Sequence, residues 1–210
     1  MNKKSFIVVV DYGMGNLLNV EKALQKVGFK TEVTNNPSVI EKTAGLVLPG
    51  VGSFKDCMTN LEKENLIEPI RCFISSGRPF LGICLGMQIL FTESEEFGQS
   101  KGLNILEGKV VPFPKNPKLK IPHMGWNSIK IKKKAPLLEG IPDNSYFYFV
   151  HSYYVIPKQK DIIATTTYYG VEFVSSIWKD NIFACQFHPE KSQKLGLTLL
   201  KNFKKAVFQC

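Results

Sequence analysis

The chain has 210 residues, is 44% hydrophobic and carries a formal net charge of +9 at pH 7. A chain of this size buries roughly 70% of its unfolded surface, so we expect residues 1–210 to form one domain with a sizeable core. Five cysteines, an odd number without close pairs, argue against a disulfide framework and a zinc site, and scattered lysines with only two arginines argue against nucleic-acid binding. We expect neither a metal ion nor a cofactor.

The first ninety residues alternate between apolar, strand-like runs and amphipathic, helix-like stretches. Residues 5–10 are typical of a buried strand, 16–28 of a helix closed by Gly28, and 45–48 of a second strand. Helical stretches follow near 55–76. This alternation predicts parallel strands joined by right-handed crossovers.

The N-terminus superficially resembles the start of a signal peptide, because Asn2-Lys3-Lys4 precedes an apolar run. Asp11 interrupts that run, however, and no small-residue cleavage site follows. We therefore expect a cytoplasmic protein with no membrane segment.

The next apolar run breaks at a cysteine. Residues 79–83 suit a buried parallel strand and 85–91 a helix, which places Cys84 on the sharp turn between them. Gly82 and Gly86 leave room for the strand and the helix to approach each other. Such a turn strains the backbone and lifts the side chain clear, while the start of the helix offers free N–H groups to a thiolate. Cys84 is a candidate nucleophile, although buried cysteines are usually inert.

From about 103 to 187 the chain becomes strand-rich, as at 146–150 and 162–167, and a final helix is expected at 193–208. We interpret these strands as a mixed extension of the sheet. The fold class is therefore α/β, with a central, mixed but mostly parallel sheet flanked by helices. The lysine-rich run 130–134 alternates like a solvated strand edge, where lysine blocks unwanted pairing.

A second apolar run ends at Phe187-His188-Pro189-Glu190. Imidazole exchanges protons near pH 7, so His188 suits the role of a base for a cysteine, and a carboxylate at Glu190 can fix its tautomer. Because ligands bind at the carboxyl ends of strands in an α/β sheet, we expect Cys84, the loop at 49–54 and His188 on one rim. The alternative, a surface histidine in a turn, suits an isolated histidine better than one accompanied by an elbow cysteine.

Together, Gly82-Ile83-Cys84-Leu85-Gly86 and Gln186-Phe187-His188-Pro189-Glu190 resemble the class I, triad-type glutamine amidotransferases over essentially the whole chain. The segments 10–16, 49–54, 122–127 and 148–153 narrow the resemblance to the glutaminase subunits of imidazole glycerol phosphate synthases.

This resemblance implies a flavodoxin-like fold with a nucleophile elbow and the cleavage of L-glutamine to L-glutamate and ammonia. It also implies a heterodimer with a (β/α)₈-barrel cyclase subunit. That partner uses the ammonia to make imidazole glycerol phosphate and an aminoimidazole carboxamide ribotide in histidine biosynthesis.

The resemblance also assigns roles to individual residues. The catalytic residues would be Cys84, His188 and Glu190. The oxyanion donors would be the backbone N–H of Leu85 and that of Val51 or Gly52. By the same resemblance, the loop with Val51 and Gly52 would hold an inactive conformation until the partner and the acceptor substrate bind. The alternative for this loop is a simple strand-to-helix turn. Glutamine would be read by Gly52, Gln88, Glu96, Ser152 and Tyr153. The partner surface would include Asn16, Met124, Trp126, Asn127, Tyr148 and Lys191.

Several alternatives remain open on the sequence. Glu96 lies in an acidic turn that is typical of a merely solvated segment, and Trp126 and Tyr148 suit an ordinary core. A cysteine peptidase with the same elbow is disfavoured by Gln88 and the His-Pro-Glu segment, and a non-catalytic binding subunit by the intact triad. Paralogues that supply ammonia to sugar amidotransferases of surface polysaccharide synthesis share the glutaminase half of the reaction.

Overall fold

The computed structural model describes residues 6–115, 117 and 119–208. The segment Asn2-Lys3-Lys4, Ser5 and Cys210 lie outside the described residues. Where the chain is described, no helix combines the length and the apolar character that crossing a bilayer requires.

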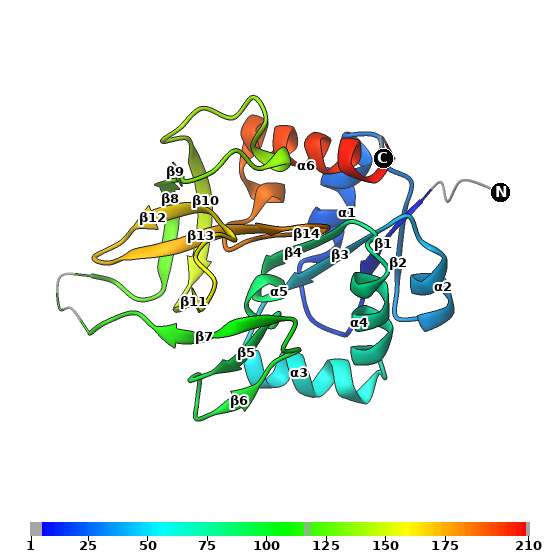
Figure 1. Ribbon diagram of the computed structural model, residues 1–210, viewed down its shortest axis with the longest axis horizontal. Coiled ribbons are helices and arrows are strands. Elements are labelled where there is room, and N and C mark those ends of the chain that lie inside the picture. Colours follow the sequence, from blue (N-terminus) through cyan, green and yellow to red (C-terminus); the bar gives the residue numbers. More distant parts are fainter. Residues whose placement is uncertain (1–5, 116, 118, 209–210) are drawn as a thin grey trace.

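An eight-stranded mixed sheet forms the centre of the described structure (Figure 1). From edge to edge its strands are β2 (Thr31–Thr34), β1 (Ile7–Val10), β3 (Gly45–Gly50), β4 (Phe80–Cys84), β14 (Ile182–Cys185), β13 (Glu172–Lys179), β12 (Ile163–Tyr168) and β9 (Lys130–Ile131). The first five are parallel and the last three join in antiparallel pairs. The predicted mostly parallel α/β sheet is therefore confirmed.

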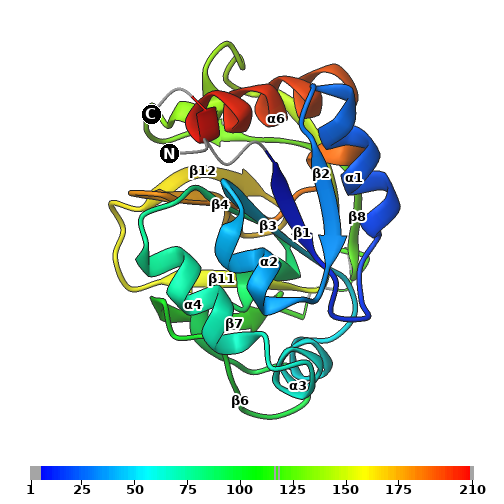
Figure 2. The ribbon, with the colours of Figure 1, turned by 90° about the vertical axis from the view of Figure 1, so that its right-hand side faces the viewer.

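Helices cover both faces of this sheet (Figure 2). One face carries α1 (Leu17–Lys26) and α6 (Gln193–Phe208), and the other carries α2 (Pro37–Lys42), α3 (Phe54–Lys63) and α4 (Ile67–Ser75). Successive residues of β1 alternate between the two cores, because side chains of a strand point to opposite faces. Both faces are thus dry, which explains why the first strand reads as an unbroken apolar run.

The predicted helices correspond closely to the observed ones. The helix expected at 16–28 is α1, followed by Gly28 with a φ of 87°. The helical stretches near 55–76 are α3 and α4, which separate at Asn65, where φ is 55°. The expected C-terminal helix is α6.

Two elements escaped the pattern analysis because they are short and half polar. Strand β2 has the sequence Thr-Glu-Val-Thr and lies at an edge of the sheet, so it has no apolar run. Helix α2 spans six residues and begins at Pro37, with the side chain of Asn36 accepting a hydrogen bond from the N–H of Ser38 (2.9 Å). Such a cap stabilises a short helix without producing a visible period.

The prediction that the strand-rich region simply extends the sheet is only partly right. Strands β9, β12, β13 and β14 do extend it, but β8 (His123–Ser128) pairs with β10 (Tyr146–His151) in a separate sheet. A further four-stranded sheet contains β11 (Tyr153–Pro157), β7 (Leu106–Pro112), β5 (Phe91–Ser94) and β6 (Ser100–Lys101). Sequence patterns reveal strands, but strand partners depend on tertiary contacts.

The lysine-rich segment 130–134 lies at the sheet edge, as predicted. Strand β9 is the last strand in the order and pairs with β12. Lys132 forms an ion pair with Glu172 (2.9 Å), and the ammonium of Lys133 lies 4.7 Å from the centre of the Trp178 ring. These lysine side chains therefore make contacts within the fold at the edge of the sheet.

Cys84 occupies the predicted tight turn between β4 and α5 (Leu85–Gln88), with a φ of 56° and a ψ of −110°. A side chain in this left-handed region carries strain of order 1–3 kcal/mol. Two glycines make the turn possible. A Cβ on Gly82 would lie 2.6 Å from the carbonyl oxygen of Gly86, and a Cβ on Gly86 would overlap the carbonyl oxygen of Leu48.

The helix expected at 85–91 is wrong in its length. Helix α5 is a single turn, and Phe91 already begins β5, where it pairs with Leu106 of β7. The apolar run therefore divides between a turn of helix and a strand. A turn this short also offers less helix dipole to a thiolate than the sequence suggested.

Gly86→Ala should destabilise the fold by at least about 2 kcal/mol, because the added methyl group would force β3 and the elbow apart. Alanine otherwise favours a helix over glycine by about 1 kcal/mol, so a loss of stability can be assigned to the clash. Urea unfolding followed by circular dichroism measures it. Gly77→Ala is the control, since no atom lies within 4 Å of the added Cβ and only its φ of +75° is strained. A Gly86→Ala variant as stable as the parent would contradict this account of the elbow.

Candidate active site

The pairing of β4 with β14 brings the two candidate catalytic segments together. Cys185 pairs with Ile83 in this parallel ladder, so the chain leaves β14 on the same rim where Cys84 sits. On the other side of β4, Gly50 of β3 pairs with Cys84 itself, so the loop that follows begins beside the nucleophile. The three segments predicted to share one rim do so.

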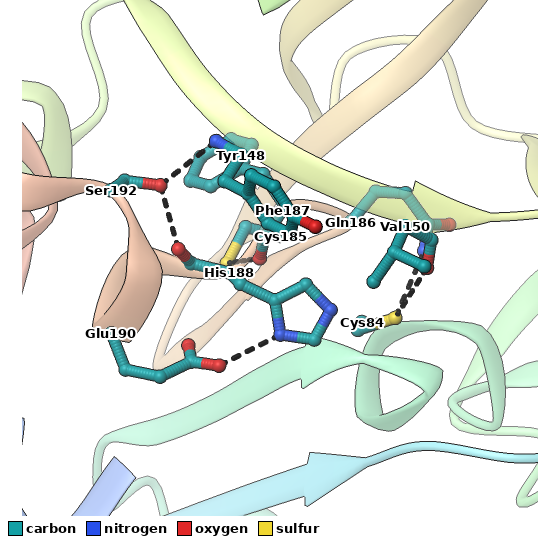
Figure 3. Close-up of polar contacts among 9 residues, drawn as sticks. All are labelled: Cys84, Tyr148, Val150, Cys185, Gln186, Phe187, His188, Glu190 and Ser192. Atoms are coloured by element: carbon teal, nitrogen blue, oxygen red, sulfur yellow. Dashed lines mark hydrogen bonds and ion pairs between the residues drawn. The ribbon is translucent and has the colours of Figure 1, made fainter. Parts of the chain in front are cut away.

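His188 is held in place by its backbone and by Glu190. Its Nδ1 lies 2.8 Å from Oε1 of Glu190, and the side chains of both residues are almost fully buried, at 3% and 2% exposed. The N–H of His188 donates to the carbonyl of Tyr148 (2.9 Å), and its carbonyl accepts from the hydroxyl of Ser192 (2.6 Å). The imidazole therefore lies between Glu190 and Cys84 with little freedom to rotate (Figure 3).

The electrostatics of His188 favour an imidazolium. Burial by itself lowers the pKa of His188, but the interactions with Cys84 and with Glu190 outweigh it and raise this pKa to about 10. The Nε2 atom is buried, has no hydrogen-bond partner among the described residues, and points toward the sulfur of Cys84 (Figure 3). The geometry is that of a cysteine and a histidine that share a proton.

The sulfur of Cys84 has two further polar neighbours. Its S–H can donate to the carbonyl of Val150 (3.8 Å), and the side-chain amide of Gln186 donates to the sulfur (3.6 Å). Gln186 is fully buried and also accepts a hydrogen bond from Gln88 (2.9 Å). A fully buried amide that contacts the candidate nucleophile is uncommon enough to suggest a specific role.

A cavity of about 330 Å³ opens at this rim. It is lined by Cys84 and His188, by the predicted oxyanion and substrate residues Val51, Gly52, Leu85, Gln88, Glu96, Ser152 and Tyr153, and by Pro122, Val150 and His151. Glu190 lies behind His188, outside the lining. The volume suits a small ligand. Among the described residues, no group of three or more His, Cys, Asp or Glu side chains is placed to hold a metal ion.

Glu96 differs from the other carboxylates of its turn. Glu96 is buried and accepts a hydrogen bond from the N–H of Phe54 at the start of α3 (2.6 Å), whereas Glu95 is exposed and pairs with Lys109 (3.0 Å). Burial raises the pKa of Glu96, and the hydrogen bond from Phe54 opposes this. The interpretation of this segment as a merely solvated acidic turn therefore holds for Glu95 and is wrong for Glu96.

The candidate partner residues lie mostly on the outer face of the sheet formed by β8 and β10. Met124 and Trp126 are 65% and 47% exposed, and the Trp126 ring meets that of Tyr148 edge to face at 6.1 Å. The ammonium of Lys191 lies 5.7 Å from the centre of the Tyr148 ring. An ordinary core position is thus wrong for Trp126.

Two of the partner candidates are placed differently. Asn127 is half-buried, and its amide bonds internally to the carbonyl of Tyr168 (3.0 Å), on the face of β8 away from Trp126. Asn16 is half-buried at the start of α1 and makes no side-chain cap hydrogen bond.

Sequence reasoning missed four polar residues that surround this site. Gln186 and Ser192 contact Cys84 and His188, while His151 lines the cavity and bonds to His123 behind it (2.9 Å). Each lies in or beside a segment that the analysis singled out for a neighbouring residue. For Gln186 and His151, the available signal was a polar residue at the end of an apolar run.

Cys84→Ala should lower the pKa of His188 from about 10 by at least about one unit, because the variant keeps Glu190 but removes the thiolate charge. Titration of the histidine ring signals by NMR measures it, with His188→Gln used for assignment. His123 and His151 are internal controls whose pKa values should hardly move. An unchanged His188 pKa would mean that no thiolate faces this ring.

Comparison with known proteins agrees with this geometry. Residues 8–206 match the protein family described as glutamine amidotransferase class-I. The chain is 54% identical to the imidazole glycerol phosphate synthase subunit HisH of Syntrophotalea carbinolica, over 94% of this chain and 98% of that one, and 54% identical to HisH of Aquifex aeolicus, over 94% and 95%. The solved structure of PurLQS from Thermotoga maritima shares the fold, with a TM-score of 0.75, 17% identity and 98% coverage of both chains. The chain therefore belongs to the class-I glutamine amidotransferase family.

Proposed function

We propose that residues 1–210 form one glutaminase domain that cleaves L-glutamine at Cys84 and passes the ammonia to a cyclase subunit of imidazole glycerol phosphate synthase, in the cytoplasm. The observation that carries the proposal is the placement of Cys84, His188 and the predicted glutamine-reading residues on one small cavity. The names of the 54% identical relatives support the acceptor half of the proposal and do not favour a sugar amidotransferase.

The first half-reaction forms a thioester. The thiolate of Cys84 attacks the side-chain amide carbon of glutamine, and the carbonyl oxygen becomes an oxyanion. Backbone N–H groups of Leu85 and of Val51 or Gly52, which line the cavity, are the proposed donors to it. Nε2–H of His188 protonates the leaving nitrogen. The oxyanion collapses, the C–N bond breaks and ammonia departs, so that the γ-glutamyl group remains on Cys84 as a thioester.

The second half-reaction restores the enzyme. Neutral His188 takes a proton from a water molecule, which attacks the thioester carbon. The C–S bond breaks, glutamate leaves, and the thiolate and imidazolium re-form. Throughout, Glu190 accepts from Nδ1–H at 2.8 Å and holds the ring in the tautomer that presents Nε2 to the sulfur.

Polar groups of the cavity would read the two ends of glutamine. Gln88 uses its amide N–H groups on the carbonyl of Tyr153 and on Gln186, which leaves its Oε1 as an acceptor for the α-ammonium. Glu96 adds negative charge to the same cavity, and Gly52, Ser152 and Tyr153 complete its lining. These groups would favour glutamine over a peptide chain, because the cavity is small and polar side chains line it.

Ammonia explains the need for a partner. In neutral water most of it becomes ammonium, which is no nucleophile, so a shielded passage to the acceptor preserves its reactivity. The exposed apolar face at Met124, Trp126 and Tyr148 is the proposed docking surface, together with Lys191 and Asn16. Asn127, also expected there, directs its side chain to the carbonyl of Tyr168 on the opposite face of β8. We also propose that the loop at Val51 and Gly52 reaches its active setting by a peptide flip when the partner and its substrate bind.

Cys84→Ala should lower glutamine-dependent synthesis by the complex at least about a thousandfold while ammonia-dependent synthesis persists, because only the nucleophile is lost. The two rates are measured on the same preparation with glutamine or with ammonium salt. Loss of both rates would mean that Cys84 supports the fold rather than the chemistry.

The isolated chain should hydrolyse glutamine slowly, and this hydrolysis should accelerate when a co-purified cyclase and its nucleotide substrate are added. A glutamate assay measures the acceleration of glutamine hydrolysis.

Trp126→Ala should weaken binding of the cyclase at least tenfold, about 1.4 kcal/mol, because it removes an exposed aromatic anchor. Titration calorimetry measures the binding of the cyclase. Phe208→Ala is the matched control, since this half-exposed ring lines a groove with Pro79 and Asn181 at the opposite end of β4 and β14. Equal binding by the two variants would place the partner elsewhere.

A further inference from the structure

The orientation of the Gln186 amide is fixed by a backbone carbonyl. Nε2 of Gln88 donates to the carbonyl of Tyr153 and to Oε1 of Gln186, both at 2.9 Å. A carbonyl only accepts, so the Gln88 atom that faces it is nitrogen, and the Gln186 atom that faces Gln88 is oxygen. The other end of Gln186, 3.6 Å from the sulfur of Cys84, is therefore an N–H donor.

A second chain of hydrogen bonds reaches the same Tyr153 carbonyl from the other side. It begins at Asn127, whose Oδ1 accepts from the N–H of Ser128 (2.8 Å) and whose Nδ2 donates to the carbonyl of Tyr168 (3.0 Å). That nitrogen also lies 3.2 Å from Nε2 of His123. Because Asn127 is the donor, Nε2 of His123 is the acceptor, and the proton of this ring resides on Nδ1.

The two buried histidines hold the Tyr153 carbonyl in place. His123 and His151 are partners across β8 and β10, and Nδ1 of His123 donates to Nε2 of His151 at 2.9 Å. The remaining nitrogen of His151, Nδ1, donates to the carbonyl of Tyr153 at 2.8 Å. Burial lowers the pKa of His123 to about 4 and that of His151 to about 3, so both rings are neutral, as this chain of donors requires.

The polar contacts of Cys84 change with its protonation state. A thiol can donate to the Val150 carbonyl at 3.8 Å, but a thiolate has no proton to give and requires donors. The amide of Gln186 is fully buried and cannot turn to water, and a hydrogen bond to a charged acceptor is stronger than one to a neutral acceptor. The contact thus favours the thiolate.

We propose that Gln186 is a catalytic residue whose side-chain N–H stabilises the thiolate of Cys84. His123 and His151 are positioning residues, which keep that N–H aimed at the sulfur through the Tyr153 carbonyl and Gln88. This assignment rests on the proposed glutaminase function and adds a neutral donor, independent of pH, to the charged donor His188.

The other ionisable groups around the sulfur do not supply this donor. Burial raises the pKa of both Tyr12 and Cys185, so each keeps its proton, but each gives it to another acceptor. The hydroxyl of Tyr12 donates to the carbonyl of Pro49 (2.9 Å), and the thiol of Cys185 donates to the carbonyl of Phe187 (3.3 Å). Glu190 acts behind His188, at its far nitrogen. Glu96 lines the same cavity, where it brings negative charge and no donor to a thiolate.

Alkylation by iodoacetamide tests the donor, because only the thiolate reacts. Mass spectrometry of the Cys84 peptide separates it from the exposed Cys72. Gln186→Met removes the donor at similar size and should shift the midpoint of the alkylation rate upward by about one pH unit. Gln186→Glu keeps the acceptor for Gln88 but turns a carboxylate oxygen to the sulfur, so its upward shift should be larger. Gln159→Glu, on an exposed glutamine, is the control for added charge and should not shift the midpoint.

A double-mutant cycle tests the positioning residues. His123→Phe preserves the stacking on Tyr169 and Phe149, whose ring centres lie 4.0 and 5.0 Å from that of His123, but removes the donor to His151. It should raise the alkylation midpoint by about half a pH unit alone and add nothing to Gln186→Met, because both changes act through one amide. Additive shifts would overturn the positioning role.

The unmodified protein gives an independent measurement if a variant fails to fold. The side-chain amide proton of Gln186 should move downfield in NMR spectra with the same midpoint as Cys84 alkylation. No movement, or no shift of the alkylation midpoint in folded Gln186→Met and Gln186→Glu, overturns the proposal. None of these measurements uses glutamine or a partner subunit, so a thiolate effect without glutaminase activity would refute the proposed function alone.

Discussion

The parallel pairing of β4 with β14 is the constraint on which the rest of this site depends. It joins strands from distant parts of the chain, Ile83 opposite Cys185, and thereby places the residues that follow each strand on the same rim. The strain at Cys84 is tolerated because Gly82 and Gly86 permit backbone contacts that no larger residue would. Without this pairing, the elbow would present a cysteine with no base beside it.

The three histidines of the chain show that charged partners can outweigh burial in deciding the charge of a ring. All three rings are buried, which disfavours the imidazolium. His188 faces a sulfur and a carboxylate and is charged, whereas His123 and His151 face each other, an amide and a carbonyl, and are neutral. One small region therefore contains a charged imidazole and two neutral ones.

Much of the fold was predictable from local pattern, because buried parallel strands and amphipathic helices leave clear periods in the sequence. The elbow was predictable from glycines that flank a cysteine, and the base from a histidine followed by proline and glutamate. The short elements β2 and α2 were not, since their polar edges carry no period. The separate sheet of β8 and β10 was not either, because strand partners are chosen by contacts between distant segments.

The sequence by itself determined the chemical groups: a thiol on a tight turn, an imidazole with a carboxylate two residues away, and the alternation that makes an α/β sheet. Only the tertiary structure decided which polar groups meet around the sulfur. The direction of the Gln186 amide, the tautomers of His123 and His151, and the burial of Glu96 beside an exposed Glu95 arise from contacts across separate sheets. The physical reason is that a hydrogen bond takes its direction from its partner in space, which neighbours along the chain do not specify.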